Sequence, residues 1–597
     1  MKEFLKFTFA SFIGIAIFAT INLLIGIMVI GSILAADSTV PPVPENSVLA
    51  LNLSGNVVER NNEQDLPIMK YLGTEMDYQG LDMLTEAISK AKDNSQVKGM
   101  YVELGPVSFD SPATMIALRR ALNDFKKSGK WIVAYGDVVT QGAYYVASAA
   151  DKLYLNTTGQ IEFKGLGRQT TYLKGLYDKI GVKYQTVKVG KYKSFVESNT
   201  RTNMSDEDRE QRLAYMNGIW NIMTDDIAQS RHIEAARLKQ YANDSILMFA
   251  QQKDYLQMKL IDGLLYPEEV KAEVQKRLGL DKDDDIMQIS ARNMALAEQP
   301  KKKDKGDEVA VYYAIGDIND MDLSNLTGET GIVGKTMAAD LRELADDDDV
   351  KAVVIRVNSG GGSAVASEQI HHAVELLKKK KPVVVSMGGA AASGGYMISC
   401  GASHIIAEPA TITGSIGIFG MIPNISSLMT DKLGITYDEV STSKYTNAVE
   451  RLVTAKNNEQ ELKFLQNSVD WGYDRFISMV AQGRQLTKER VHEIAQGRVW
   501  LGKDAVKLGL VDQLGSLDDA VKKAAELAKL DDYHPQAYPE LENWTDRLMK
   551  QLSDNNNYLE SAMRELWGSH YHDWVMLRTA SKRNRLQAAL PFSIVVE

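Results

Sequence analysis

The chain has 597 residues, 44% of them apolar and 24% charged, and this balance is typical of globular domains, which excludes a largely disordered, collagen-like or coiled-coil protein. The 68 basic and 78 acidic side chains give a formal net charge of −10, which argues against nucleic acid as a partner because basic side chains are needed to neutralise phosphates. Cys400 is the only cysteine, so intramolecular disulfides and cysteine-rich metal sites are excluded.

The first predicted element is a long uncharged segment at the N-terminus. After Lys2 and Lys6, no charged residue occurs over residues 7–36. A helix needs about 20 apolar residues to cross a bilayer, so this segment is long enough to be an anchor. A cleaved signal peptide is the alternative, but its apolar region is only roughly 7–15 residues long and ends in a small-residue cleavage site, which residues 32–36 match poorly. We therefore expect an uncleaved transmembrane helix within residues 1–36.

The lysines before this segment predict its orientation. Positive charge is retained on the cytoplasmic side of a membrane, so Lys2 and Lys6 predict a cytoplasmic N-terminus and an exported body. No later segment approaches the roughly 18 uncharged apolar residues of a membrane helix, so we expect a soluble body on a single anchor. Residues 37–46 contain three prolines and are expected to form an extended spacer.

An internal repeat predicts the domain organisation. Three pairs of segments match at one constant spacing of 253 residues, namely 97–102 with 350–355, 179–184 with 432–437, and 191–197 with 444–450. We therefore expect a tandem duplication, with a first half over residues 47–299 and a second half over residues 308–530. A charged linker, residues 300–307, joins the halves, and residues 531–597 are expected to form a polar, helical tail.

Strand-like and helix-like segments alternate within each half. In the second half, residues 337–344 and 368–380 have the apolar spacing of helices, whereas residues 352–357 and 382–387 resemble short buried strands. This alternation predicts an α/β fold that is built from parallel βα units.

Two loops of small residues follow predicted strands in the second half. The first contains Gly360, Gly361 and Gly362, and consecutive glycines allow backbone N–H groups to point into a cavity and bind an oxyanion. The second contains Ser393 and Gly394 where a helix should begin, a position that favours developing negative charge. Taken alone, the first loop could equally be a flexible turn and the second a close helix–strand contact.

The repeat assigns one candidate catalytic side chain to each half. In the first half, Gln141 stands opposite Ser393, and residues 105–109 have lost the glycine run. Conversely, Lys193 of the first half stands opposite Thr446 of the second. Each half thus contributes one candidate, and Ser393 and Lys193 together could supply a nucleophile and a general base.

The identity of the base leaves one alternative open. The chain has eight histidines, and His371, His372 and His404 lie near the two loops in sequence, so a Ser–His–Asp triad is not excluded. A lysine acts as a base when burial lowers its pKa towards neutrality. The complementary positions of Lys193 and Ser393 in the repeat favour the lysine.

Four segments resemble the signal peptide peptidase A (protease IV) family in its long, duplicated type: GKYKSFVE at 190–197, RVNSGGGS at 356–363, AASGGY at 391–396 and TGSIGIFG at 413–420. The resemblance extends over about residues 45–530 and includes the N-terminal anchor. It implies a tandem Clp-protease/crotonase-like fold with Ser393 as nucleophile and Lys193 as general base. It also implies oxyanion donors at Gly394 and Gly361, with Gly362 beside them. Gly360 departs from the family, which commonly has proline at this position.

The resemblance also implies an activity and a location. It predicts a membrane-anchored serine endopeptidase that degrades cleaved signal peptides by acyl transfer, on the periplasmic or external side of the cytoplasmic membrane, as a bowl-shaped homotetramer. The substrate is expected to lie extended along residues 383–387 as an added strand at a sheet edge, and no metal, ATP or other cofactor is implied. The Ser–Lys pair could form within one chain or between neighbouring subunits. We expect the second arrangement, because adjacent domains of the family's tetramer share sites.

Three other functions are weaker interpretations. A crotonase-type acyl-CoA enzyme also uses two backbone N–H groups, but it would need neither the Ser393–Lys193 pair nor an anchor. Residues 331–336 look like the phosphate loop of an NTPase, but Glu329 stands where that motif requires glycine. An inactive membrane scaffold would need neither candidate catalytic side chain.

Overall fold

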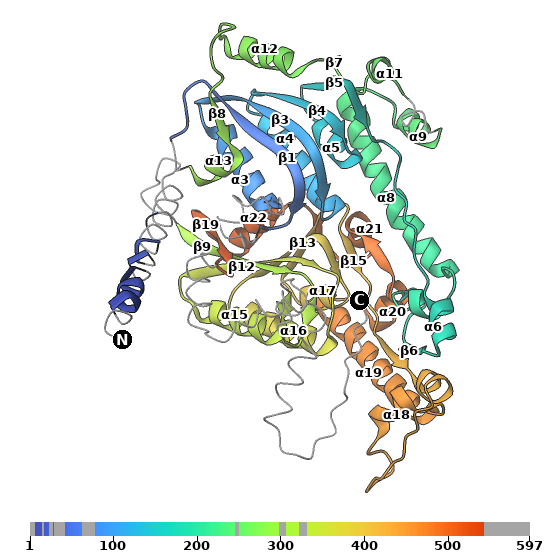
Figure 1. The fold of residues 1–597 in the computed structure, drawn as a ribbon. Coiled ribbons are helices and arrows are strands. Elements are labelled where there is room, and N and C mark those ends of the chain that lie inside the picture. Colours follow the sequence, from blue (N-terminus) through green and yellow to red (C-terminus); the bar gives the residue numbers. More distant parts are fainter. Residues whose placement is uncertain are drawn as a thin grey trace. The chain divides into compact units, whose positions relative to one another are not determined.

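The computed structural model describes residues 6–14, 17–18, 20–22, 28, 42–61, 78–244, 250–297, 306–321 and 331–541. Within these residues the chain forms two large sheets, one in each half, with helices packed against them (Figure 1).

The first half is built on one parallel sheet. Its seven strands lie in the order β2-β1-β3-β4-β5-β7, with β8 also paired to β1, and all these pairs are parallel. A parallel sheet is covered on both faces and therefore needs apolar side chains on both. Leu49, Leu51 and Leu53 of β1 belong to one core cluster, and Val48 belongs to the other. The strands are β1 (Ser47–Val58), β2 (Tyr78–Gly80), β3 (Val97–Phe109), β4 (Trp131–Val139), β5 (Lys152–Ile161), β7 (Gly263–Leu264) and β8 (Gln288–Ser290).

Helices cover both faces of this sheet. The core on the Leu49 face includes side chains of α3 (Leu81–Asp93), α4 (Pro112–Lys126), α5 (Gln141–Ala147), α8 (Asp206–Arg231), α9 (Ala235–Asn243), α11 (Gln252–Gln257) and α13 (Ala291–Leu296). The other face is covered by α12 (Pro267–Leu278). Local signals define the helix starts: at α4, the Ser111 hydroxyl accepts a hydrogen bond from the Thr114 N–H and Pro112 occupies the first helical position.

The second half repeats this plan. Its main sheet has the order β17-β15-β13-β12-β9-β19, with β14 between β13 and β18, and only the β15–β17 pair is antiparallel among its described strand pairs. The strands are β9 (Asp307–Ile315), β12 (Val350–Ser359), β13 (Val383–Ala392), β14 (His404–Ala407), β15 (Ile412–Gly414), β17 (Val499–Leu501), β18 (Gln513–Leu514) and β19 (Tyr533–Tyr538). A separate short pair consists of β10 (Ile318–Asn319) and β11 (Ile332–Val333).

The helices of the second half also lie on two faces. One core contains side chains of α15 (Gly334–Asp346), α16 (Ala364–Lys378), α17 (Gly394–Ser399), α19 (Glu459–Arg484), α20 (Lys488–Ile494) and α21 (Gly502–Lys507). The other core is formed with α22 (Leu517–Ala528). The expected helices over residues 337–344 and 368–380 correspond to α15 and α16, and the expected strands over 352–357 and 382–387 correspond to β12 and β13.

Two expectations about strands are wrong. Residues 533–538, expected to be helical, form β19, because they pair with β9 and thereby satisfy the backbone groups of that strand. Residues 383–387 do not lie at a sheet edge. They pair with β12 on one side and with β14 on the other, so both edges of this segment are already hydrogen bonded and no substrate strand can be added there.

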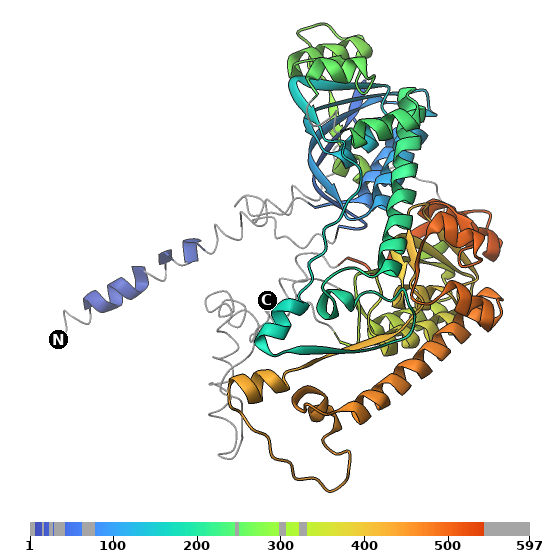
Figure 2. The ribbon, with the colours of Figure 1, turned by 90° about the vertical axis from the view of Figure 1, so that its right-hand side faces the viewer.

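One pair of strands connects the two halves. β6 (Lys183–Lys188) of the first half pairs antiparallel with β16 (Phe419–Asn424) of the second (Figure 2). β6 follows α6 (Lys174–Ile180) and precedes α7 (Glu197–Thr200). On the second-half side, β16 is followed by the π-helix η1 (Leu428–Lys432) and α18 (Ala448–Thr454). The β6–β16 pairing therefore places the segment after β6 against the second half.

The N-terminal segment is described only in part. Residues 6–14 are helical, and among the described residues no helix is both long enough and apolar enough to cross a membrane. Much of the expected anchor, residues 37–41 of the expected spacer and residues 542–597 of the expected tail lie outside the described residues.

Candidate active site

Ser393 lies on a strained turn between β13 and α17. It is the N-cap of α17, and its backbone has φ +54° and ψ −116°, a region that side-chain-bearing residues rarely occupy. Its N–H donates to the Gly414 carbonyl over 2.9 Å, and its carbonyl accepts from the Met397 N–H over 2.9 Å. A serine on a sharp strand-to-helix turn of this kind presents its hydroxyl above the sheet, as nucleophilic serines do.

Lys193 reaches this hydroxyl from the segment between β6 and α7. Its Nζ lies 3.0 Å from Ser393 Oγ, and the residue is only 5% exposed. Burial lowers the pKa of Lys193 from 10.5 to about 8, because the uncharged amine loses less hydration than the ammonium. No carboxylate of the described residues forms an ion pair with it. These conditions favour the neutral amine that a general base requires.

The pair forms within one chain, although 200 positions separate its members. The β6–β16 pairing carries Lys193 from the first half to the loop that follows β13. The expectation that the pair forms between neighbouring subunits is therefore wrong for this structure, because one copy already contains both side chains at hydrogen-bond distance.

Ser415 is a third member of the site that sequence reasoning missed. Its carbonyl and its hydroxyl each lie 3.0 Å from Lys193 Nζ, and its φ is +50°. With Ser393 Oγ these two oxygens surround the nitrogen and fix its position. A signal was present, because Ser415 lies within the 413–420 motif and the corresponding stretch of the first half, residues 160–167, contains no serine.

The glycine loop approaches Ser393 and Gly394 through its backbone. A Cβ added at Gly361, whose φ is +103°, would lie 2.6 Å from the Gly394 nitrogen, so this close approach requires glycine. The Gly361 N–H donates to Ser359 Oγ over 3.1 Å and is therefore occupied. The N–H groups of Gly362 and Gly394 have no acceptor within the described part of the chain. The expectation that Gly361 donates to an oxyanion is therefore wrong, and the free donors are Gly394 and Gly362. Gly361 instead allows the close approach, because it has no side chain.

The histidines and the repeat equivalents do not join the site. The His371 ring nitrogen lies 3.0 Å from the Met397 carbonyl, and His404 lies 3.8 Å from an Asp512 carboxylate oxygen. No histidine of the described ranges contacts Ser393. In the first half, the Gln141 carbonyl oxygen accepts hydrogen bonds from the N–H groups of Lys164 and Gly165, each over 2.9 Å, so this side chain holds a loop in place.

An aromatic surface lies beside the pair. The rings of Phe195 and Phe419 are 5.1 Å apart, Phe195 is 69% exposed, and Lys193 Nζ lies 5.9 Å from the Phe419 ring centre. This surface can contact an apolar group that approaches Ser393. Among the described residues, no cluster of three or more His, Cys, Asp or Glu side chains is suited to a metal ion.

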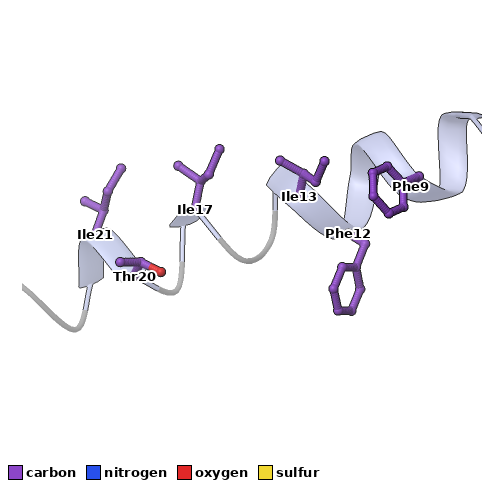
Figure 3. Close-up of a pocket in the computed structure, with 6 residues that line it drawn as sticks. All are labelled: Phe9, Phe12, Ile13, Ile17, Thr20 and Ile21. Atoms are coloured by element: carbon purple, nitrogen blue, oxygen red, sulfur yellow. The ribbon is translucent and has the colours of Figure 1, made fainter.

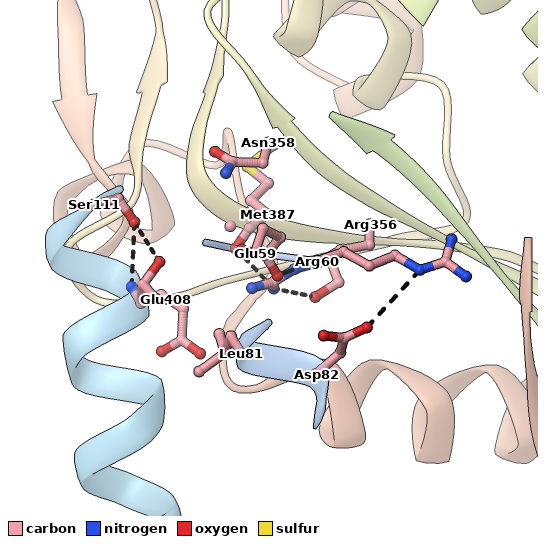
Figure 4. A network of polar contacts seen from close by, with 12 residues as sticks. Glu59, Arg60, Leu81, Asp82, Ser111, Arg356, Asn358, Met387 and Glu408 are labelled. Carbon is pink, nitrogen blue, oxygen red and sulfur yellow. Dashed lines mark hydrogen bonds and ion pairs between the residues drawn. The ribbon is translucent and has the colours of Figure 1, made fainter. Parts of the chain in front are cut away.

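A buried polar network joins the first half to the strands that carry both loops (Figure 4). Arg356 of β12 donates from Nε to Glu59 Oε1 over 2.6 Å and from Nη1 to Ser386 Oγ over 2.9 Å. Its exposed side-chain fraction is 3%, and that of Glu59 is 4%. Two residues further along β12, the Asn358 amide donates to Asp110 Oδ2 over 3.2 Å. First-half carboxylates thus hold the strand that leads into the glycine loop.

Comparison with known proteins agrees with this architecture. The model of Peptidase family S49 matches residues 124–281 and 375–531, and that of Clp protease matches residues 328–412. "Protease 4" of Salmonella typhi is 35% identical over 520 residues, which cover 85% of this chain and 82% of the relative. "Protease 4" of Haemophilus influenzae is 37% identical over 452 residues, 74% and 72% of the two chains. "Serine protease SPPA, chloroplastic" of Arabidopsis thaliana is 29% identical over 455 residues, 75% and 66%.

Two tandem halves with a Clp-protease-like fold, matched over most of their length by proteases, define a serine-type peptidase. The chain belongs to peptidase family S49. The duplication inferred from the repeat and the resemblance to the signal peptide peptidase A family are both confirmed by these matches.

Proposed function

We propose that this chain is a serine endopeptidase that uses Ser393 and Lys193 as a catalytic dyad. The observation that carries the proposal is the 3.0 Å contact between Lys193 Nζ and Ser393 Oγ at a buried position where the pKa of the lysine falls to about 8. A lysine with this pKa is neutral in a useful fraction of molecules near neutral pH, and it can therefore take the proton of a serine hydroxyl.

The mechanism is acyl transfer in two steps. Neutral Lys193 accepts the Ser393 proton while Oγ attacks the peptide carbonyl carbon, and the N–H groups of Gly394 and Gly362 donate to the oxyanion. The lysine ammonium then gives its proton to the leaving amine, and the acyl-enzyme remains. Lys193 next deprotonates a water molecule, which attacks the ester and releases the acid and the Ser393 hydroxyl. During both steps, the two oxygens of Ser415 hold Lys193 Nζ beside Ser393.

A fluorophosphonate probe tests this assignment. Activated serines attack the phosphorus centre, so we expect one label per chain at Ser393, located by peptide mass spectrometry, and none on the Ser393→Ala variant. Gln141→Ala is the matched control, because Gln141 occupies the equivalent position in the first half, and it should be labelled like the unmodified chain. Labelling at another serine, or a labelled and active Ser393→Ala variant, would exclude the dyad. An acyl-CoA enzyme or a scaffold would not be labelled at Ser393.

We infer that the substrates are extended apolar peptides, such as the remnants of cleaved signal peptides. The resemblance to the signal peptide peptidase A family supports this substrate class. Phe195 and Phe419 add physical support, because the aromatic surface beside Lys193, with Phe195 exposed, gains free energy by burying apolar side chains of a substrate.

We further propose that residues 7 to about 33 anchor the chain in the cytoplasmic membrane, with the catalytic body on the external side. The described part of this segment supports the proposal: Phe9, Phe12, Ile13, Ile17 and Ile21 expose between 43% and 70% of their surface, and Ile13, Ile17 and Ile21 point to one side (Figure 3). N-terminal sequencing of protein purified from membranes is expected to begin at or near Met1. A mature chain that begins near Ala36 would identify a cleaved signal peptide instead.

The repeat also supports assembly into a homotetramer. In one chain, residues 180–194 of the first half reach across to β16 of the second. The equivalent second-half segment, residues 433–447, and the first-half equivalent of β16, residues 166–171, are mostly exposed and belong to no strand of the described structure. We propose that residues 433–447 of one copy pair with residues 166–171 of the next. Such a head-to-tail contact can close into a ring.

A surface substitution tests this contact. Val440 is 96% exposed in the segment 433–447, and Val440→Asp is expected to shift the chain from tetramer towards monomer in light scattering. Leu527→Asp, at a 39% exposed position on α22, is the control and should not alter the mass. An unchanged tetramer in Val440→Asp would place the interface elsewhere.

A further inference from the structure

Gly497 and Arg498, which immediately precede β17, contact Lys193 and Ser415 through their backbone. Gly497 has φ +74°, and a Cβ added there would lie 2.7 Å from the Lys193 Cβ, so the two main chains touch. The next residue, Arg498, accepts a hydrogen bond at its carbonyl from the Ser415 N–H over 2.7 Å. This short segment therefore lies against both Lys193 and the serine that holds the lysine nitrogen.

The side chain of Arg498 contacts Tyr192, the residue that precedes Lys193. Its guanidinium lies 4.7 Å from the centre of the Tyr192 ring, and Nη1 donates to the Tyr192 hydroxyl over 2.9 Å. The ring of Trp500 lies 4.5 Å from the guanidinium, and Glu210 of α8 pairs with Nη1 at 2.9 Å. Two rings, a hydroxyl and a carboxylate thus fix the side chain, which Arg matches better than Lys because of its planar fork.

Tyr192 is itself held tightly. It is 7% exposed, its N–H donates to the Gln496 carbonyl over 2.9 Å, and its carbonyl accepts from the Gln211 amide over 3.0 Å. A displacement of Tyr192 therefore moves the backbone of Lys193 directly, and no flexible segment lies between them.

We propose that Arg498 is a positioning residue for the Lys193–Ser393 pair, fixing the lysine backbone with its side chain through Tyr192 and the acceptor Ser415 with its carbonyl. It is part of the second half, whereas Tyr192 and Glu210 are part of the first, so it links the half that carries the nucleophile to the half that carries the base. The inference rests on the proposed Ser–Lys mechanism. It adds a residue that none of the candidate motifs contained.

The test is a set of pH–rate profiles for the full-length chain. Arg498→Ala is expected to lower kcat about 10- to 100-fold and to change KM less than about threefold, since the missing contact acts on the chemical step. Looser packing hydrates Lys193 and raises its pKa, so the rising limb of the profile should move to higher pH. Tyr192→Phe, which keeps the ring and loses only the hydroxyl, should produce the same shift with a smaller loss of kcat. Arg490→Ala, at a surface arginine paired with Glu493, should leave the profile unchanged.

The outcomes separate positioning from folding and from the mechanism itself. A loss of activity in Arg498→Ala and Tyr192→Phe without movement of the rising limb would overturn the positioning role and indicate a merely structural one. An unaltered kcat in both variants would overturn it as well. If Lys193→Arg keeps its activity, the Ser–Lys mechanism fails, whatever Arg498 does. If Lys193→Arg is inactive and the Arg498→Ala profile is normal, only the positioning role fails.

Discussion

Replacing Lys193 by arginine is expected to lower peptide hydrolysis by at least about a thousandfold while the fold persists. Arginine keeps the positive charge, but its guanidinium does not release a proton under ordinary conditions, so Ser393 loses its base. The loss of one member of a catalytic unit typically lowers kcat by several orders of magnitude. Steady-state kinetics on an apolar peptide measure the effect, and circular dichroism checks the fold. Lys488→Arg, at a surface lysine paired with Asp474, is the matched control.

Near-normal turnover of Lys193→Arg would show that the lysine is only a structural cation. The pH dependence adds an independent criterion. In the proposed mechanism the base is the neutral amine, and the pKa of Lys193 is lowered to about 8, so activity should rise with pH through about 8 and then level off. A histidine base would instead produce a rise near its ordinary pKa of about 6.5, and replacing His371, His372 and His404 would then abolish activity.

Replacing Glu59 by alanine is expected to lower the free energy of unfolding by about 3–5 kcal/mol, because it leaves the buried Arg356 guanidinium without its carboxylate. Arg356 also donates to the Met387 carbonyl over 3.3 Å. Met387 lies on β13, the strand that leads to Ser393, so activity should fall together with stability. The denaturant midpoint measures the effect. The control is Asp504→Ala. Asp504 forms a surface ion pair with Lys507, and the two side chains are 39% and 74% exposed, respectively. The free energy of unfolding of this variant is expected to change by no more than about 1 kcal/mol.

A double variant distinguishes an unpaired charge from lost packing. Glu59→Met combined with Arg356→Met removes both charges and fills similar volume, and such replacements are often neutral or stabilising. We therefore expect the double variant to be more stable than Glu59→Ala. A double variant as unstable as the single one would mean that the network contributes through its hydrogen bonds to Ser386 and Met387 rather than through charge neutralisation.

The sequence predicted that Ser393 and Lys193 lie together, because the duplication keeps one register over long stretches and each half retains one candidate catalytic side chain; the structure places the two side chains at hydrogen-bond distance. It also predicted the alternating strands and helices of the second half, whose apolar spacing is set by burial on the sheet faces. The β6–β16 pairing, which brings Lys193 to Ser393, could not be predicted. The partner of a short strand such as β6 is decided by tertiary contacts and not by its own residues.

The remaining differences are also tertiary in origin. Gly361 and Gly362 have the same side chain, and only the backbone path shows that the N–H of Gly361 is used by Ser359 while that of Gly362 is free within the described residues. β19 became a strand because β9 offers it an edge. Ser415 and Arg498 act on Lys193 from positions 222 and roughly 300 residues away, distances over which sequence pattern carries no geometric information.

The β6–β16 pairing has a consequence for the stage of synthesis at which Lys193 and Ser393 can come together. During synthesis Lys193 leaves the ribosome well before Ser393, and both precede Phe419–Asn424, the strand that must pair with β6 before the two side chains can meet. A shorter nascent chain either lacks Ser393 or contains both side chains without the strand that aligns them. In the proposed mechanism, proteolytic activity therefore requires synthesis to continue at least beyond Asn424.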